Sequence, residues 1–190
     1  MITFRNIDAS EFRILRNHFD YFGKQILDRI SKNKHFVVGH GKRKEIFLIS
    51  KCLYEIYTKL KKFRSPYYLG LFLGTIVKNK FIYSLNSLQI LNKYSNKKII
   101  TNYRGEIQFI YGNDLYSKHI LKIPINFKKY DKILVVNSRN ELLGLGMTLY
   151  PILKSISQDD TMTKKNDKIT KQNIKIKNLI DIGWYLRKGK

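Results

Sequence analysis

The sequence holds one cysteine, Cys52, in 190 residues. A single thiol excludes an internal disulfide framework and any zinc site that needs a cysteine pair, and such usage is typical of a reducing compartment. We expect Cys52 to pack as a small apolar residue. The four histidines show no ligand spacing, so the sequence predicts no metal site; they are His18, His35, His40 and His119.

Long apolar runs are also absent. No run reaches the roughly 18 residues that a membrane span requires, and the first 30 residues alternate charged with apolar groups. We therefore expect a soluble protein that is not secreted and has no membrane partner. No coiled-coil repeat or obvious dimer seam is present either, which favours a monomer.

Motifs for nucleotide or acid–base chemistry are incomplete. "GHGK" has Phe36 and Arg43 where a phosphate-binding loop needs Gly and Ser or Thr, and "GLG" at 144–146 lacks the third glycine of a dinucleotide turn. Asp159 and Asp160 are adjacent carboxylates in an irregular segment, which cannot hold a general acid in the fixed geometry that catalysis demands. The sequence thus predicts no catalytic residue and no cofactor.

Acidic residues are scarce: 14 Asp and Glu accompany 37 Lys and Arg, for a formal net charge of +23. The excess is spread evenly, with 18 basic and 6 acidic residues in 1–95 and 19 and 8 in 96–190. A folded protein this basic repels itself, and a polyanion that releases counterions on binding is the usual compensation. Nucleic acid is therefore the expected partner, with compositional drift in an AT-rich genome as the alternative.

The N-terminal half reads as alternating helices and strands. Asp8 and Glu11 have capping-box spacing, and an apolar periodicity follows that predicts one helix to about Ile30. "KHFVV" and "EIFLIS" flank a polar glycine-containing loop, which predicts paired strands. Ser50 can cap a second helix. After it, "YYLGLFLGTIV" and "KFIYSL" are β-rich, and "NSLQILNKY" predicts a third helix capped by Asn86 or Ser87.

Beyond Tyr94 the pattern changes to short β-type runs, namely "KIIT", "IQFIYG", "ILKIPI", "KILVV" and "LLGLGMTLY". Their spacing suits a small barrel, with a hairpin over 132–149. Residues 155–172 have no periodicity and predict a mobile loop. The chain closes with a strand in which Ile alternates with Lys, followed by a short basic helix. We therefore divide the chain into domains 1–95 and 96–190.

Four segments, in this order, resemble the Nip-seven family of large-subunit ribosome-biogenesis factors: "YYLGLFLGTIVKNKFIYSLNSLQIL", "EIQFIYGNDLYSKHILKI", "KILVVNSRNELLGLGMT" and "IDIGWYLRK". The resemblance implies an α+β protein, in which an N-terminal α/β domain with an antiparallel sheet precedes a PUA mixed β-barrel that binds RNA. It also implies that Phe109 and Tyr111 pack inward or at the rim of the barrel; for Tyr111 we favour the barrel core, with base stacking on RNA as the alternative.

Two departures from the family pattern lie in the PUA half. "NYRGE" keeps only Gly105 and Glu106 of a longer family stretch, and Trp184 stands where a Glu usually follows "DIG". Both bear on the local turns and on the binding surface, and neither bears on the fold.

The resemblance implies a non-catalytic RNA-binding factor for large-subunit assembly and precursor rRNA processing. Its partners would be precursor ribosomal RNA and other assembly proteins, the latter on the N-terminal domain, in the nucleolus and nucleus or, for an archaeal source, the cytoplasm. The expected RNA contacts are outward-facing cations of the PUA half: Lys175, Lys177, Arg187, Lys188, Lys118 and Lys122.

Two other functions stay open. PUA domains also accompany RNA-modification enzymes, but 95 N-terminal residues are few for such a catalytic domain. A structural ribosomal protein would share the charge and would remain in finished subunits.

Overall fold

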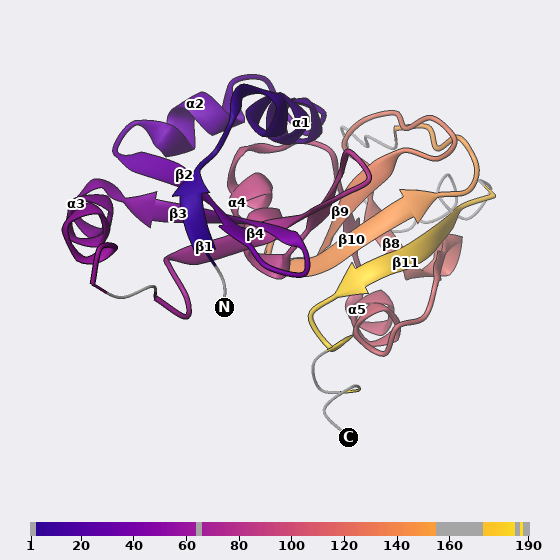
Figure 1. Cartoon of the computed structure of the whole chain (residues 1–190). Helices are drawn as coiled ribbons and strands as arrows, with labels where there is room; N and C mark the ends of the chain where they lie inside the picture. The colour runs from indigo at the N-terminus through magenta and orange to yellow at the C-terminus, as the bar shows by residue number, and fades with distance from the viewer. Residues whose placement is uncertain (1–2, 64–65, 155–172, 185–186, 188–190) are drawn as a thin grey trace. The chain divides into compact units, whose positions relative to one another are not determined.

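The computed structural model describes residues 3–63, 66–154, 173–184 and 187 (Figure 1). The predicted loop at 155–172 and most of the predicted terminal helix lie outside these residues. The chain divides into two compact units, Met1–Tyr94 and Ser95–Lys190, each with its own sheet.

The N-terminal unit contains a five-stranded antiparallel sheet of order β1-β2-β3-β4-β5. Its strands are β1 (Thr3–Asn6), β2 (Lys34–His40), β3 (Lys44–Ser50), β4 (Leu71–Val77) and β5 (Lys80–Tyr83). The register runs from Lys34 opposite Ser50 to His40 opposite Lys44, which confirms the predicted pairing of "KHFVV" with "EIFLIS".

Helices cover both faces of this sheet. On one face lie α1 (Ala9–Asp20) and α2 (Ile26–Ser31), with Phe12 against Phe36 and Phe19 against Phe81. On the other lies α3 (Lys51–Leu60), over a core of Val37, Phe47, Ile49 and Leu69. The unit ends with α4 (Leu85–Tyr94). Ser50 caps α3 as predicted, because its hydroxyl accepts from the Leu53 N–H.

Three expectations for this unit are wrong. The helix predicted to run to about Ile30 is two helices, because Gln25 has a left-handed φ of 60° and interrupts the helical backbone before α2. The third helix begins at Leu85, and the Ser84 hydroxyl accepts from the Ser87 N–H, so neither Asn86 nor Ser87 is its cap. Cys52 is exposed on α3 rather than packed.

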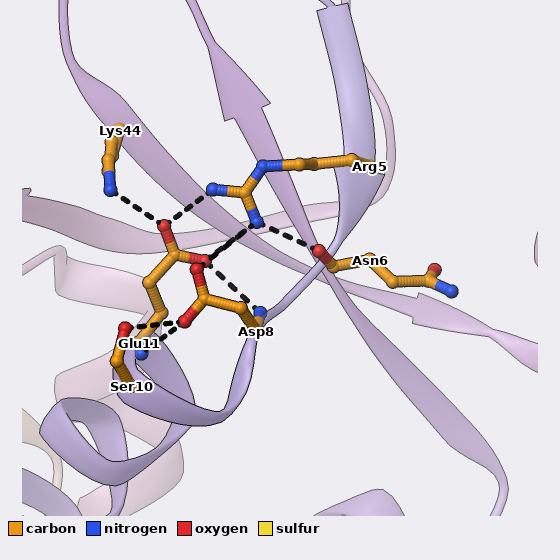
Figure 2. A network of polar contacts seen from close by, with 6 residues as sticks. All are labelled: Arg5, Asn6, Asp8, Ser10, Glu11 and Lys44. Carbon is orange, nitrogen blue, oxygen red and sulfur yellow. Dashed lines mark hydrogen bonds and ion pairs between the residues drawn. The ribbon is translucent and has the colours of Figure 1, made fainter.

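A polar network ties the start of α1 to the sheet (Figure 2). Asp8 forms the predicted capping box with Glu11. The Glu11 carboxylate, 2% exposed, also accepts from both terminal nitrogens of Arg5 at 2.6 and 2.8 Å, and from Lys44 Nζ at 3.0 Å. Burial acts to raise the pKa of Glu11, but the hydrogen bonds from Arg5 and Lys44 outweigh it and leave that pKa below its ordinary value.

The C-terminal unit contains a six-stranded mixed sheet of order β7-β11-β10-β9-β6-β8. Its strands are β6 (Lys98–Thr101), β7 (Leu115–Tyr116), β8 (Ile120–Lys122), β9 (Lys132–Val136), β10 (Leu142–Thr148) and β11 (Lys175–Asp181). Only β6 and β9 pair in parallel. The 3-10 helix η1 (Ser117–His119) joins the two edge strands β7 and β8, so the sheet is a near-closed barrel. The predicted α+β class and the 132–149 hairpin are confirmed.

The segment "IQFIYG", predicted as a strand, instead forms the second half of helix α5 (Tyr103–Ile110) and the turn that follows it. The Asn102 side chain caps this helix by accepting from the Gly105 N–H, and Phe109 is fully buried in the barrel core. Gly112, at φ 86°, ends the helix and turns the backbone. Tyr111 is 68% exposed, so its predicted place in the barrel core is wrong: it lies at the helix end, beyond the face that Phe109 buries.

Candidate nucleic-acid interface

Strand β11 presents two of the predicted lysines. Ile174 and Ile176 are 2% and 0% exposed, whereas Lys175 is half-buried and Lys177 is exposed. The alternation follows from the pleat, which sends successive side chains to opposite faces of a strand. The two ammonium groups therefore share the outer face of the barrel.

Lys175 lies beside an exposed aromatic ring. It is paired with Tyr116 of β7, and its Nζ is 5.7 Å from the centroid of that ring, which is a cation–π distance. Its Nζ is also 4.0 Å from Asp114, whose carboxylate accepts from the Asn178 N–H. Tyr116 is 44% exposed, so its ring and the ammonium form one accessible surface.

The short helix η1 holds Lys118 at the start of β8. The Asn102 amide donates to the Lys118 carbonyl at 2.8 Å, and the Asn102 N–H donates to the His119 carbonyl at 3.1 Å. A Cβ on Gly105 would come within 2.4 Å of that same His119 oxygen, so only glycine allows α5 to pack this closely on η1. The backbone of Lys118 is fixed, while its side chain is exposed.

His119 reinforces this turn from inside. Its side chain is buried, and its Nδ1 accepts from the Tyr116 N–H at 3.2 Å. Burial, and then the charge of Lys118, lowers the pKa of His119. The ring is therefore neutral at neutral pH, as the acceptor role requires.

Lys122 is also exposed to solvent. It lies on β8 opposite Ile100 of β6. Lys118 thus lies on η1, Lys122 on β8, and Lys175 on β11 beside β7, the strand that η1 joins to β8.

Two exposed residues that sequence reasoning missed lie at the start of α5. Tyr103 is 76% exposed and Arg104 is also exposed, directly after Asn102, whose amide contacts η1. The signal was Asn102, a residue type favoured at the start of a helix, with Glu106 in the first turn, and the β-rich residues after it concealed this signal. We call the combined set the η1 surface: Tyr103, Arg104, Tyr116, Lys118, Lys122 and Lys175.

Arg187 lies apart from this surface. Its guanidinium donates to both oxygens of the buried Asp181, at 2.7 and 3.0 Å, and also to the Ile110 carbonyl. Asp181 ends β11 and Lys175 begins it, so the two sites are separated by six strand residues, or about 20 Å. The predicted cations are therefore split between the two ends of one strand, and Lys188 lies outside the described residues.

The described part of the chain contains no group of three or more His, Cys, Asp and Glu side chains arranged to hold a metal ion. None of the helices within it has the length and apolar composition needed to cross a membrane.

Both halves of the chain match domains of a known protein family. Residues 4–85 match the NIP7/UPF0113 pre-PUA domain, and residues 97–190 match the UPF0113 PUA domain. A UPF0113 protein of Archaeoglobus fulgidus is 28% identical over the whole chain and 97% of that protein. A Saccharomyces cerevisiae protein, named as the 60S ribosome subunit biogenesis protein NIP7, is 30% identical over 63% of this chain and 60% of its own length.

Solved structures show the same fold. A hypothetical protein of Pyrococcus horikoshii superposes with a TM-score of 0.54 at 12% identity, over 97% of this chain and 99% of its own. A conserved PUA domain protein of Thermoplasma acidophilum gives 0.53 at 15%, over 97% of each chain. With its antiparallel sheet and helices followed by a mixed barrel, the chain belongs to the NIP7/UPF0113 family of proteins with a pre-PUA and a PUA domain.

Proposed function

We propose that this protein is a non-catalytic RNA-binding factor that assists large ribosomal subunit assembly and precursor rRNA processing. One observation carries the proposal: on a chain with a PUA domain, the Lys175 ammonium lies 5.7 Å from the exposed ring of Tyr116, next to η1 and its exposed Lys118. The names of the matched fission and budding yeast relatives, both 60S ribosome subunit biogenesis proteins, support the ribosomal context.

The mechanism would be occupancy rather than bond chemistry. Lys118, Lys122 and Lys175, with Lys177 further along β11, would contact phosphates, and the exposed rings of Tyr103 and Tyr116 would stack on unpaired bases. Phosphate contacts carry no sequence information, so the choice of RNA would come from its shape and from protein partners. The bound rRNA segment would be held in a conformation that processing requires.

The N-terminal domain would supply the protein contacts. In the described residues α3 buries none of its side chains fully, and large apolar groups around it are exposed. These residues are Ile56, Leu60, Phe63, Tyr67 and Tyr68. The factor would act as a monomer where large subunits are assembled, which is the nucleolus and nucleus in a eukaryotic cell and the cytoplasm in an archaeal cell.

The RNA-binding part is tested with the double variant Lys175→Glu and Lys177→Glu and a uridine-rich RNA. Each lost phosphate contact with this single-stranded RNA should remove about 0.7 units from the slope of log affinity against log salt concentration. The matched control, Lys61→Glu with Lys62→Glu, reverses two exposed charges in the other domain and should bind more tightly than the test variant. An unchanged slope in the test variant would reject this surface.

The assembly part is tested by sedimentation of cell extracts. An assembly factor should co-sediment with pre-ribosomal particles and be absent from translating polysomes. Presence in polysomes would instead identify a structural ribosomal protein. Altered RNA product after incubation with the purified protein would identify a modification enzyme.

A further inference from the structure

The N-terminal domain has a pocket of ≈ 320 Å³ where two hairpins of its sheet end side by side. The loop between β2 and β3 and the turn between β4 and β5 line it. Four cationic side chains are among its lining residues, and no carboxylate is. These cations are Lys42, Arg43, Lys44 and Lys78.

The sheet itself sets the shape of this pocket. His40 is paired with Lys44, and Lys44 with Ile76, so the ends of the two hairpins adjoin. The Gly41 N–H donates to the Arg43 carbonyl at 3.3 Å and closes the first loop. Lys78 and Asn79, at φ 47° and 60°, have the left-handed backbone of a type I′ hairpin turn. The cations are thus carried on backbone that is already fixed.

The four cations differ in how they are neutralised. Lys44 is bound to the buried Glu11 carboxylate at 3.0 Å, which Arg5 shares (Figure 2). Lys42, Arg43 and Lys78 are exposed, and among the described residues none of them has a carboxylate within ion-pair distance. Three positive charges that line one pocket without counter-charges raise the local concentration of anions, and a phosphate oxygen accepts strong charge-assisted hydrogen bonds from such groups.

We propose that this pocket binds a phosphate of the RNA backbone, so that the N-terminal domain makes its own RNA contact in addition to that of the barrel. This inference rests on the proposed RNA-binding function. It assigns a second role to a domain that the η1 surface does not involve, and it explains why the positive charge is spread over both halves of the chain.

The test uses the full chain with Lys42→Gln, Arg43→Gln and Lys78→Asn, because Asn tolerates the left-handed turn position. The matched control is Lys51→Gln, Lys59→Gln and Lys62→Gln, which removes three exposed charges on and just after α3. With a uridine-rich RNA, the pocket variant should lose about two units of salt slope, at about 0.7 for each single-strand phosphate contact. The control should lose less than half as much. Adding Lys175→Glu and Lys177→Glu to the pocket variant should lower the slope further.

The outcomes separate this inference from the function on which it rests. If the wild type binds RNA and the pocket variant has the same slope as the control, the inference is overturned and RNA binding by the barrel stands. If the wild type binds no RNA at low salt, the inference and the proposed RNA-binding function are both rejected. If the pocket variant loses affinity for polyglutamate but not for RNA, the pocket recognises acidic peptides and the inference is likewise overturned.

Discussion

Glu11 is the residue on which the start of the N-terminal domain depends, since its carboxylate neutralises Arg5 and Lys44 at once. Glu11→Gln removes the counter-charge of Lys44 and leaves Arg5 only its longer 3.7 Å contact with Asp8, so it should lower the stability of this domain by about 1–3 kcal/mol. This loss of stability is smaller than that caused by breaking a fully buried ion pair, because the side chains of Arg5 and Lys44 are each 43% exposed. Hydrogen exchange of the β1 and α1 amides measures the loss, with Glu55→Gln on exposed α3 as the control.

Glu11 also makes the stability of the N-terminal domain depend on pH in the acidic range. The pKa of Glu11 is lowered on folding, so its stabilising effect is complete above the ordinary value of 4.5 and is lost as the pH falls through the lowered pKa. The stability difference between wild type and Glu11→Gln should therefore be constant near neutral pH and shrink below pH 4.5. A difference that grew on acidification would contradict the network.

Arg187 was predicted as an RNA contact, but its three hydrogen bonds to Asp181 and Ile110 indicate a supporting role in the barrel. Arg187→Gln should lower the stability of the C-terminal unit, because the buried Asp181 carboxylate loses its partner, and should leave the RNA salt slope unchanged. Urea unfolding followed by the fluorescence of Trp184, the single tryptophan, measures the first effect. Lys177→Gln should instead leave stability unchanged and lower the RNA salt slope. Equal slope losses in both variants would show that Arg187 also contacts RNA.

At the scale of elements, the position of η1 depends on how closely α5 approaches it. Gly105→Ala places a Cβ about 2.4 Å from the His119 carbonyl, so α5 must move away at a cost of about 1–3 kcal/mol. RNA affinity should fall as well although no cation is removed, because η1 carries Lys118. Urea unfolding and RNA titration measure the two losses. Gln108→Ala, on the same helix, should change stability by no more than about 0.5 kcal/mol, and a Gly105→Ala protein of wild-type stability would contradict the close packing.

Elements whose signal is local were predictable from the sequence. Asp8 and Ser50 cap the helices they were expected to cap, and the two hairpins pair as the turn-forming residues between their apolar runs indicate. Helix α5 was missed because its residues are β-rich, and its helical form depends on the Asn102 cap and on burial of Phe109 against distant strands. The same holds for the candidate site. The alternation of Ile and Lys in β11 could be predicted from the sequence. The partners of Arg187 could not, because they lie up to 77 residues away along the chain.

At the scale of the whole molecule, each unit has a separate core. Residues 95–190 expressed alone should therefore fold and bind RNA, with a smaller salt slope than the full chain because the pocket on the N-terminal domain is missing. Circular dichroism and a salt titration check both parts. An unfolded fragment would show that the barrel needs the preceding domain, and an equal slope would remove the RNA contact from that domain.

The edge strands of both sheets are short. The outer strands β1 and β5 have four residues each, and β7 and β8 have two and three, whereas β2, β3, β4, β10 and β11 have seven. Mutual repulsion between copies disappears when a polyanion covers the cations, and exposed strand edges then become the main route to stacking of chains. The edge strands of this protein are too short to pair with a strand of another copy. The protein is therefore protected from aggregation even when bound RNA neutralises the charge that otherwise keeps the copies apart.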